Sequence, residues 1–179
     1  MERNFFLRGW NSGDCKAMKP EHILLVADLL PIVFEKLMSW CDDRIRALEA
    51  PAYWLIEVSL ARSLEEAVEV LREVVSGNEG MTEERIAIVI EGCMAGVISL
   101  NETIWRLWRI WQGPDYSFET NNFPSELSGF LMDWDMYGVD DSIPDELRRE
   151  TVAWYEEYRE KQREICELVR PIVFLAQGD

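Results

Sequence analysis

Apolar residues recur at three- and four-residue steps along most of the chain, which is the spacing of amphipathic helices. The first series begins after Pro20 and continues to Cys41, and Pro31 is expected to kink the helix that the series predicts. A second, short helix is expected after Pro51. Residues 1–19 lack the pattern and predict an irregular N-terminal arm. Because no stretch alternates as a half-buried strand does, we expect an all-α fold, a single helical domain of about six helices over residues 1–179.

Polar residues mark where the next helices begin. Ser63 and Glu66 fit a capping box, in which the hydroxyl and the carboxylate each accept a backbone N–H, and this helix is expected to run to Gly77. Acidic residues after Thr82 mark the following start, since they complement the helix dipole. One long apolar helix is then expected over residues 86–111.

Two glycines and three tryptophans distinguish this long helix. Gly92 and Gly96 are expected to allow the close approach of a neighbouring helix. The tryptophans follow one another at i, i+3 and i+6: Trp105, Trp108 and Trp111. Indoles at this spacing are typical of a buried helix face. If the end of the stripe is exposed, it also predicts an aromatic-lined groove for an apolar peptide.

Two further helices are expected in the last third of the chain. One begins near Ser125 and stops before Gly138. The other opens at an N-cap candidate, Ser142, with Pro144 in its first turn, and is expected to continue to about Val169.

Composition and charge disfavour several classes of protein. Apolar residues make up 48% of the 179, and eight residues are tryptophan, which gives enough surface to bury for a folded domain rather than a disordered chain. Acidic residues outnumber basic ones by 34 to 18, and the formal charge of −16 disfavours binding to a phosphate backbone. We therefore expect a basic partner and no nucleic acid.

The sequence predicts a cytoplasmic protein with no metal, no cofactor and no membrane insertion. Its start lacks a secretory apolar segment, and the longest apolar stretch, residues 23–34, is interrupted and shorter than the roughly 20 residues that span a bilayer. The four cysteines lie far apart: Cys15, Cys41, Cys93 and Cys166. A zinc site is therefore not indicated, and a Cys in an apolar helix packs as a small hydrophobe.

Residues that suit catalysis are few. His22 stands alone at a helix start, where we expect it half in solvent, and a Ser or Cys nucleophile needs a base beside it. Glu65, Glu66 and Glu69 form EExxE, which resembles the first half of the magnesium-binding pattern of all-α nucleotide pyrophosphohydrolases. No Glu is followed three residues later by the Asp that would complete this pattern. We favour a capping box with solvated acids, and a Mg-dependent nucleotide pyrophosphohydrolase is an alternative.

Acidic residues are unopposed in one segment. Between residues 133 and 147 there are six acids and no Lys or Arg: Asp133, Asp135, Asp140, Asp141, Asp145 and Glu146. Residues 156–167, in contrast, alternate acids with bases, which indicates a solvated helix face. The unopposed segment is therefore the best candidate for binding a cationic ligand.

Four short patterns occur in order around this segment. Arg-Ile-Trp-Gln-Gly-Pro at residues 109–114 is followed by Tyr116 and Glu119, by an aromatic-to-glycine helix over residues 130–138, and by Pro-Asp-Glu-Leu at residues 144–147. Their order and spacing resemble those of the TorD/DmsD/NarJ family of redox-enzyme maturation chaperones. Glu is present at position 146 where the family has His.

The resemblance implies a non-enzymatic cytoplasmic chaperone that binds the twin-arginine signal peptide, or the body, of a molybdenum-containing oxidoreductase before export. Such a peptide is basic and then apolar, so its binder needs carboxylates beside an aromatic groove. The residues expected to bind the peptide are Trp111, Tyr116, Glu119, Trp134, Asp135, Asp145 and Glu146. The charge alone also permits an acidic interaction protein, such as a nucleic-acid mimic that blocks a basic partner.

Overall fold

All regular structure in the described part of the chain is helical. The computed structural model describes residues 19–75, 82–112, 124–137 and 144–176. Nine α-helices and one 3₁₀ helix are present in these ranges, and no strand, which confirms the all-α fold class. This is more helices than the six or so expected. The predicted N-terminal arm up to residue 18 and the predicted helix end at Gly77 lie outside the described residues.

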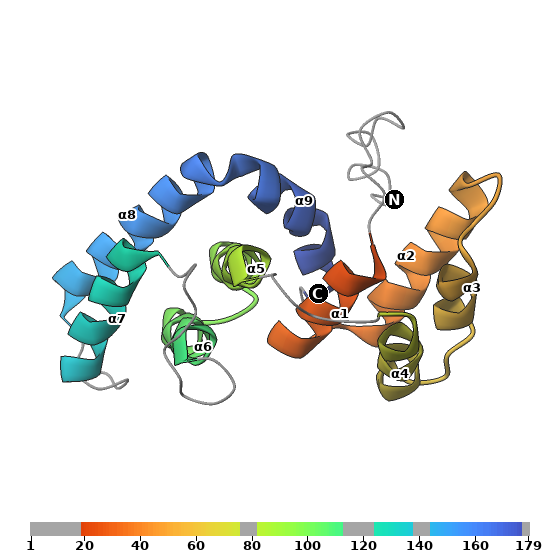
Figure 1. Ribbon diagram of the computed structural model, residues 1–179, viewed down its shortest axis with the longest axis horizontal. Coiled ribbons are helices and arrows are strands. Elements are labelled where there is room, and N and C mark those ends of the chain that lie inside the picture. Colours follow the sequence, from red (N-terminus) through yellow and green to blue (C-terminus); the bar gives the residue numbers. More distant parts are fainter. Residues whose placement is uncertain (1–18, 76–81, 113–123, 138–143, 177–179) are drawn as a thin grey trace, which may run out of the picture.

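The helices form two groups in chain order. The N-terminal group consists of α1 (Pro20–Leu29), α2 (Phe34–Ala47), α3 (Tyr53–Ser59) and α4 (Leu64–Val74). The C-terminal group consists of α5 (Thr82–Met94), α6 (Leu100–Gln112), α7 (Ser125–Tyr137), α8 (Asp145–Lys161) and α9 (Arg163–Val173), followed by the 3₁₀ helix η2 (Phe174–Ala176). In Figure 1, α8 and α9 form an arch over α5, with α7 at one end of the molecule and α3 near the other.

The first predicted helix is two helices rather than one kinked helix. Leu30, the residue before Pro31, has an extended backbone at the end of α1. This is expected because the proline ring disfavours the α conformation of the preceding residue. The chain turns here, and the Val33 N–H donates to the Leu175 carbonyl at 2.8 Å. This hydrogen bond ties the start of α2 to the C-terminal end of the described chain.

The predicted helix over residues 86–111 is also divided. Gly96 has a φ of +72° and closes α5 with the two hydrogen bonds of a Schellman motif, from its own N–H to the Cys93 carbonyl and from the Val97 N–H to the Gly92 carbonyl, both 2.9 Å. A side chain at position 96 would meet no atom within 4 Å. Gly96 therefore makes a turn, and the prediction that it packs closely is wrong.

Gly92 does allow close packing. A Cβ placed on it would lie 2.8 Å from a methyl carbon of Leu30, so the end of α1 approaches the α5 backbone directly.

After the turn at Gly96, Ser99 and Glu102 form a capping box that starts α6. The Ser99 N–H donates to the Glu102 carboxylate at 3.1 Å, and the Glu102 N–H donates to the Ser99 hydroxyl at 3.2 Å.

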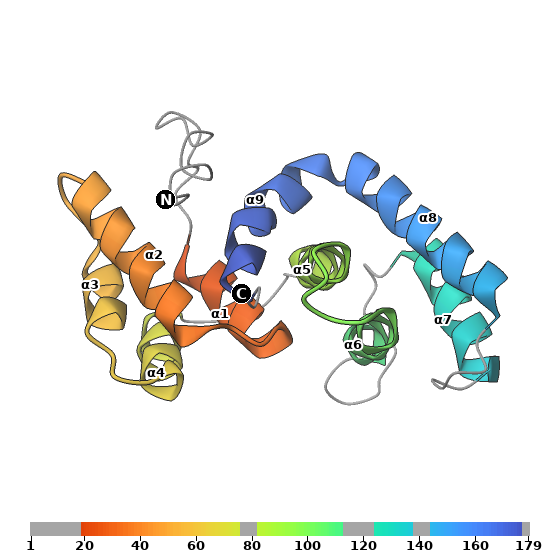
Figure 2. The ribbon, with the colours of Figure 1, turned by 180° about the vertical axis from the view of Figure 1, so that it is seen from behind.

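The last predicted helix is divided at Gln162, whose φ of −107° and ψ of 35° depart from helical values. The expectation of one helix to Val169 is therefore wrong. The bend between α8 and α9 lets both helices face α5, as the view from behind also shows (Figure 2). Pro144 lies at the N-cap of α8 rather than in its first turn, and Ser142 lies outside the described residues.

The core is centred on α5. Five consecutive residues of this helix, Ile86 to Ile90, are fully buried, which requires neighbours on every side of the helix. The helices α1, α6 and α9 provide the principal contacts. The predicted starts of α4, α5 and α7 and the short helix α3 are confirmed.

Candidate functional site

The three tryptophans of α6 form a ladder that leads out of the core. The buried side of this helix consists of Thr103, Ile104, Leu107 and Ile110. Trp105 is 53% exposed, whereas Trp108 and Trp111 are half-buried and meet edge to face with ring centres 5.1 Å apart. The prediction that the stripe is core is therefore wrong for Trp105. We call these three residues the tryptophan ladder.

The neighbouring helix α7 presents Met132, which is 55% exposed, and buries Trp134 completely. The Trp134 indole N–H donates to the Thr151 hydroxyl of α8 at 2.9 Å, and that hydroxyl donates to the Leu147 carbonyl at 2.7 Å. Trp134 therefore joins α7 to α8 and offers no surface to a peptide. Its expected place in a peptide-binding site is corrected to a place in the core.

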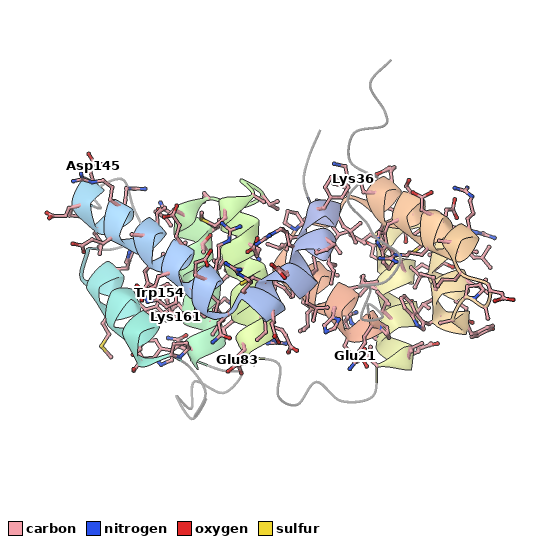
Figure 3. The ribbon with its side chains drawn as sticks, turned by 90° about the horizontal axis from the view of Figure 1, so that it is seen from above. Glu21, Lys36, Glu83, Asp145, Trp154 and Lys161 are labelled. Carbon is pink, nitrogen blue, oxygen red and sulfur yellow. The ribbon has the colours of Figure 1, made fainter. Side chains whose placement is uncertain are left out.

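Two of the expected acidic residues are accessible. Asp145 and Glu146 form the first turn of α8 and are exposed, and Asp145 lies at the outer tip of the C-terminal group (Figure 3). Tyr116 and Glu119 lie outside the described residues, as does the side chain of Asp135. The tryptophan ladder and the acidic first turn of α8 therefore lie on the same group of helices.

A buried ion cluster that the sequence reasoning missed lies beneath the arch. Glu91 is 2% exposed and lies within the run of buried residues from Ile86 to Gly92. From α8, Arg159 donates its Nε to Glu91 Oε1 at 2.7 Å and its Nη2 to Oε2 at 3.4 Å. From α9, Arg170 donates its Nε to Oε2 at 3.0 Å and its Nη2 to Oε1 at 3.1 Å. The Glu91 carboxylate therefore binds both helices of the arch, α8 and α9.

Electrostatics favour the ionised form of this carboxyl group. Burial raises the pKa of Glu91, but the hydrogen bonds and charges of Arg170 and Arg159 outweigh burial, and the pKa lies below its ordinary value. In the sequence, the only local sign of this ion cluster is a single acidic residue, Glu91, directly after the apolar run of residues 86–90. Its partners are 68 and 79 residues away, which no local pattern indicates.

The nucleophile candidates are in unreactive surroundings. Burial raises the pKa of Cys41 to about 12 and that of Cys166 to about 11, so both thiols are protonated near neutral pH. His22 is 5% exposed rather than half in solvent, and burial lowers its pKa. Its Nδ1 accepts the Lys19 N–H at 3.4 Å. Cys15 lies outside the described residues.

The EExxE motif begins α4 as a cap. The Ser63 hydroxyl accepts the Glu66 N–H at 3.2 Å, and the Glu66 carboxylate accepts the Arg62 N–H at 2.8 Å. Glu65 and Glu69 are exposed. Among the described residues, no group of three or more His, Cys, Asp or Glu side chains is arranged to hold a metal ion.

Comparisons with protein-family models, with curated proteins and with solved structures find no match for this chain. In the described ranges, no helix has both the length and the apolar character needed to cross a membrane. The fold and the site define an acidic all-α protein with an aromatic ladder on one helix and a buried ion cluster at its centre.

Proposed function

We propose that this protein is a cytoplasmic, non-enzymatic assembly chaperone that binds a basic-then-apolar segment of a client oxidoreductase, such as a twin-arginine signal peptide, before export. The observation that carries the proposal is the outer end of the tryptophan ladder, where Trp105 is 53% exposed and Trp108 is half-buried. Exposed apolar surface rimmed by polar side chains is typical of an interaction site. The family resemblance over residues 102–157 includes the same helix.

A basic-then-apolar peptide also needs carboxylates that can bind its arginines. Asp145 and Glu146 are adjacent and exposed, and neither forms a side-chain ion pair within the described part of the chain. An arginine guanidinium binds a carboxylate with two parallel N–H groups, so neighbouring carboxylates suit neighbouring arginines. Met132 adds a polarisable side chain of the kind that adapts to different apolar peptides.

The two alternatives receive less support. A Mg-dependent nucleotide pyrophosphohydrolase would need the EExxE carboxylates for the ion, but Glu66 is engaged as a cap. A nucleic-acid mimic needs carboxylates spread along one elongated face. Along the arch, acids are paired with bases instead, Lys161 with Glu157 at 2.8 Å and Arg163 with Glu160 at 2.7 Å.

Titration of the protein with a twin-arginine signal peptide, followed by tryptophan fluorescence, tests the proposal. We expect the emission to change on binding and the dissociation constant to rise with salt, because salt screens the attraction between arginine and carboxylate. A peptide with both arginines replaced by glutamine should bind at least about tenfold more weakly. Absence of binding at low salt would contradict the proposal.

The role of the acidic turn can be tested separately. Asp145→Asn should weaken binding of the twin-arginine peptide without changing the circular dichroism spectrum, because the side chain is exposed. Glu69→Gln is the matched control, since it also removes one exposed carboxylate but from α4. Equal affinity of the Asp145→Asn protein and the wild type would remove Asp145 from the site.

A further inference from the structure

Exposed apolar side chains are concentrated at the outer end of the N-terminal group. Of the nine large apolar side chains that are exposed in the described part of the chain, four lie within residues 48–60. Leu48 follows α2 and is 46% exposed. The other three belong to α3 and its C-cap, where Tyr53 is 73%, Ile56 36% and Leu60 72% exposed. We call Tyr53, Ile56 and Leu60 the α3 stripe.

The α3 stripe is one face of the helix. Its members are spaced at i, i+3 and i+7, which places them within an arc of about 60° and along about 10 Å of the helix axis. The opposite face is occupied by Leu55 and Val58, which are buried against the core, where α3 meets α2 and α4. The fold therefore uses one side of α3 and leaves an apolar side two turns long in water.

The charge around the α3 stripe is negative. Residues 19–75 contain eleven acidic and six basic side chains. Glu57 lies at the edge of the stripe, one turn from Tyr53, and its carboxylate raises the pKa of the Tyr53 hydroxyl. Glu49 and Glu65 precede and follow α3, and both are exposed. A ligand that buries the stripe gains most if it also brings cations to its rim.

A second copy of the chain and an anionic membrane fit this surface poorly. Two copies would each carry a formal charge of −16, and an anionic lipid surface would repel the same acids.

We propose that the α3 stripe docks a basic amphipathic helix of a partner protein, a second binding surface separate from the tryptophan ladder. Apolar residues of the partner at i, i+3, i+4 and i+7 would cover Tyr53, Ile56 and Leu60, and Lys or Arg beside them would meet the surrounding carboxylates. In Figure 1, α3 lies near one end of the molecule, and α6, which carries the tryptophan ladder, lies in the other half.

The test uses the full chain and two labelled helical peptides of about 18 residues, each with leucines on one face and either lysines or glutamates beside them. Fluorescence anisotropy should show binding of the lysine peptide and at least about tenfold weaker binding of the glutamate peptide. The Tyr53→Ser/Leu60→Ser protein should lose at least about tenfold in affinity for the lysine peptide. Val74→Ser, which changes an exposed side chain of α4, is the matched control.

Several outcomes would overturn the proposal. These are no binding of the lysine peptide, equal binding of the two peptides, and unchanged affinity in the Tyr53→Ser/Leu60→Ser protein. A dimer in sedimentation that the double substitution dissociates would assign the stripe to self-association, and binding to anionic vesicles would assign it to a membrane. The double substitution should leave twin-arginine peptide binding unchanged, and Trp105→Ser should leave lysine-peptide binding unchanged, so the two proposals fail independently.

Discussion

Three glycines of the C-terminal group show how backbone and packing constraints differ at single positions. Gly96 has a φ of +72° and open space around it, Gly92 touches Leu30, and Gly129 in α7 has neither a positive φ nor a neighbour within 4 Å. An alanine would therefore be strained at position 96, would clash with Leu30 at position 92, and would touch no neighbouring atom at position 129. Only the first two glycines are required by the fold.

Gly96→Ala should lower the free energy of unfolding by about 1 kcal/mol, because a Cβ is disfavoured in the left-handed region even without a clash. Gly129→Ala, the control, should raise it by about 0.5–1 kcal/mol, since alanine is a better helix former than glycine. Urea unfolding of both variants measures the difference. A Gly96→Ala protein as stable as the wild type would contradict the assigned turn.

Glu91→Gln should be among the most destabilising substitutions in α5. It leaves two guanidinium groups around a neutral amide, and we expect a loss of about 2–4 kcal/mol, less than for a fully buried cluster because Arg159 and Arg170 are partly exposed. Glu160→Gln, which removes an exposed carboxylate that pairs with Arg163, is the control and should change stability by less than about 1 kcal/mol.

The effect of Glu91 should depend on pH in one direction. Its pKa is lowered in the folded protein, so the unfolded chain binds the proton more readily, and the contribution to stability is complete above the ordinary pKa of 4.5. It is lost as the pH falls through the folded-state pKa. The stability difference between wild type and Glu91→Gln should therefore be constant near neutral pH and shrink below about pH 4.5. A difference that grows on acidification would contradict the ion cluster.

Tyr155 is fully buried, and its hydroxyl has no hydrogen-bond partner among the described residues. Tyr155→Phe should therefore leave stability unchanged or raise it by up to about 1 kcal/mol, because it removes a buried polar group that gains nothing from the fold. Tyr158→Phe, whose hydroxyl donates to the Glu83 carbonyl at 3.4 Å, is the comparison and should lower stability slightly. A clear loss of stability in Tyr155→Phe would show that the hydroxyl has a partner.

Among the elements, helix starts depend on single side chains. Ser63 and Ser99 each accept a backbone N–H from a Glu three residues later, and Ser63→Ala and Ser99→Ala should each cost about 1 kcal/mol. Ser39 lies exposed within α2, where alanine is the better helix former, so Ser39→Ala should be neutral or slightly stabilising. Thermal unfolding compares the three, and equal melting temperatures would exclude the caps.

The sequence predicted the elements where a local signal exists. Ser63, Thr82 and Ser125 mark helix starts that the structure has, and α3 follows Pro51 as expected. The break at Gly96 was missed because a glycine that packs closely and a glycine that turns the chain look alike in a sequence. The break at Gln162 carries no glycine or proline signal. It lies between Arg159 of α8 and Arg170 of α9, which bind the same carboxylate of α5.

The candidate site was less predictable than the elements. Trp134 and Trp105 occupy similar apolar patterns, yet one is buried under α8 and the other faces water, because the neighbours of a helix face are set by the tertiary arrangement. The partners of Glu91 come from helices far along the chain. Spacing on one helix identified candidate residues but not which of them share a surface.

At the scale of the whole molecule, the surplus of acids is spread over both groups of helices. The described parts of both groups carry exposed carboxylates, and the one buried carboxylate, Glu91, is matched by two arginines. The remaining charge acts in solvent, where it favours encounters with basic partners and weakens as salt is added.

The proposed function depends most directly on the tryptophan ladder. Isothermal titration calorimetry of the twin-arginine peptide should be carried out on the wild type, on Trp105→Ser and on Val152→Ser, which changes another exposed apolar side chain on α8. We expect the wild type and Val152→Ser to bind equally and Trp105→Ser to bind at least about tenfold more weakly. No binding by the wild type, or equal binding by the Trp105→Ser protein, would contradict the account.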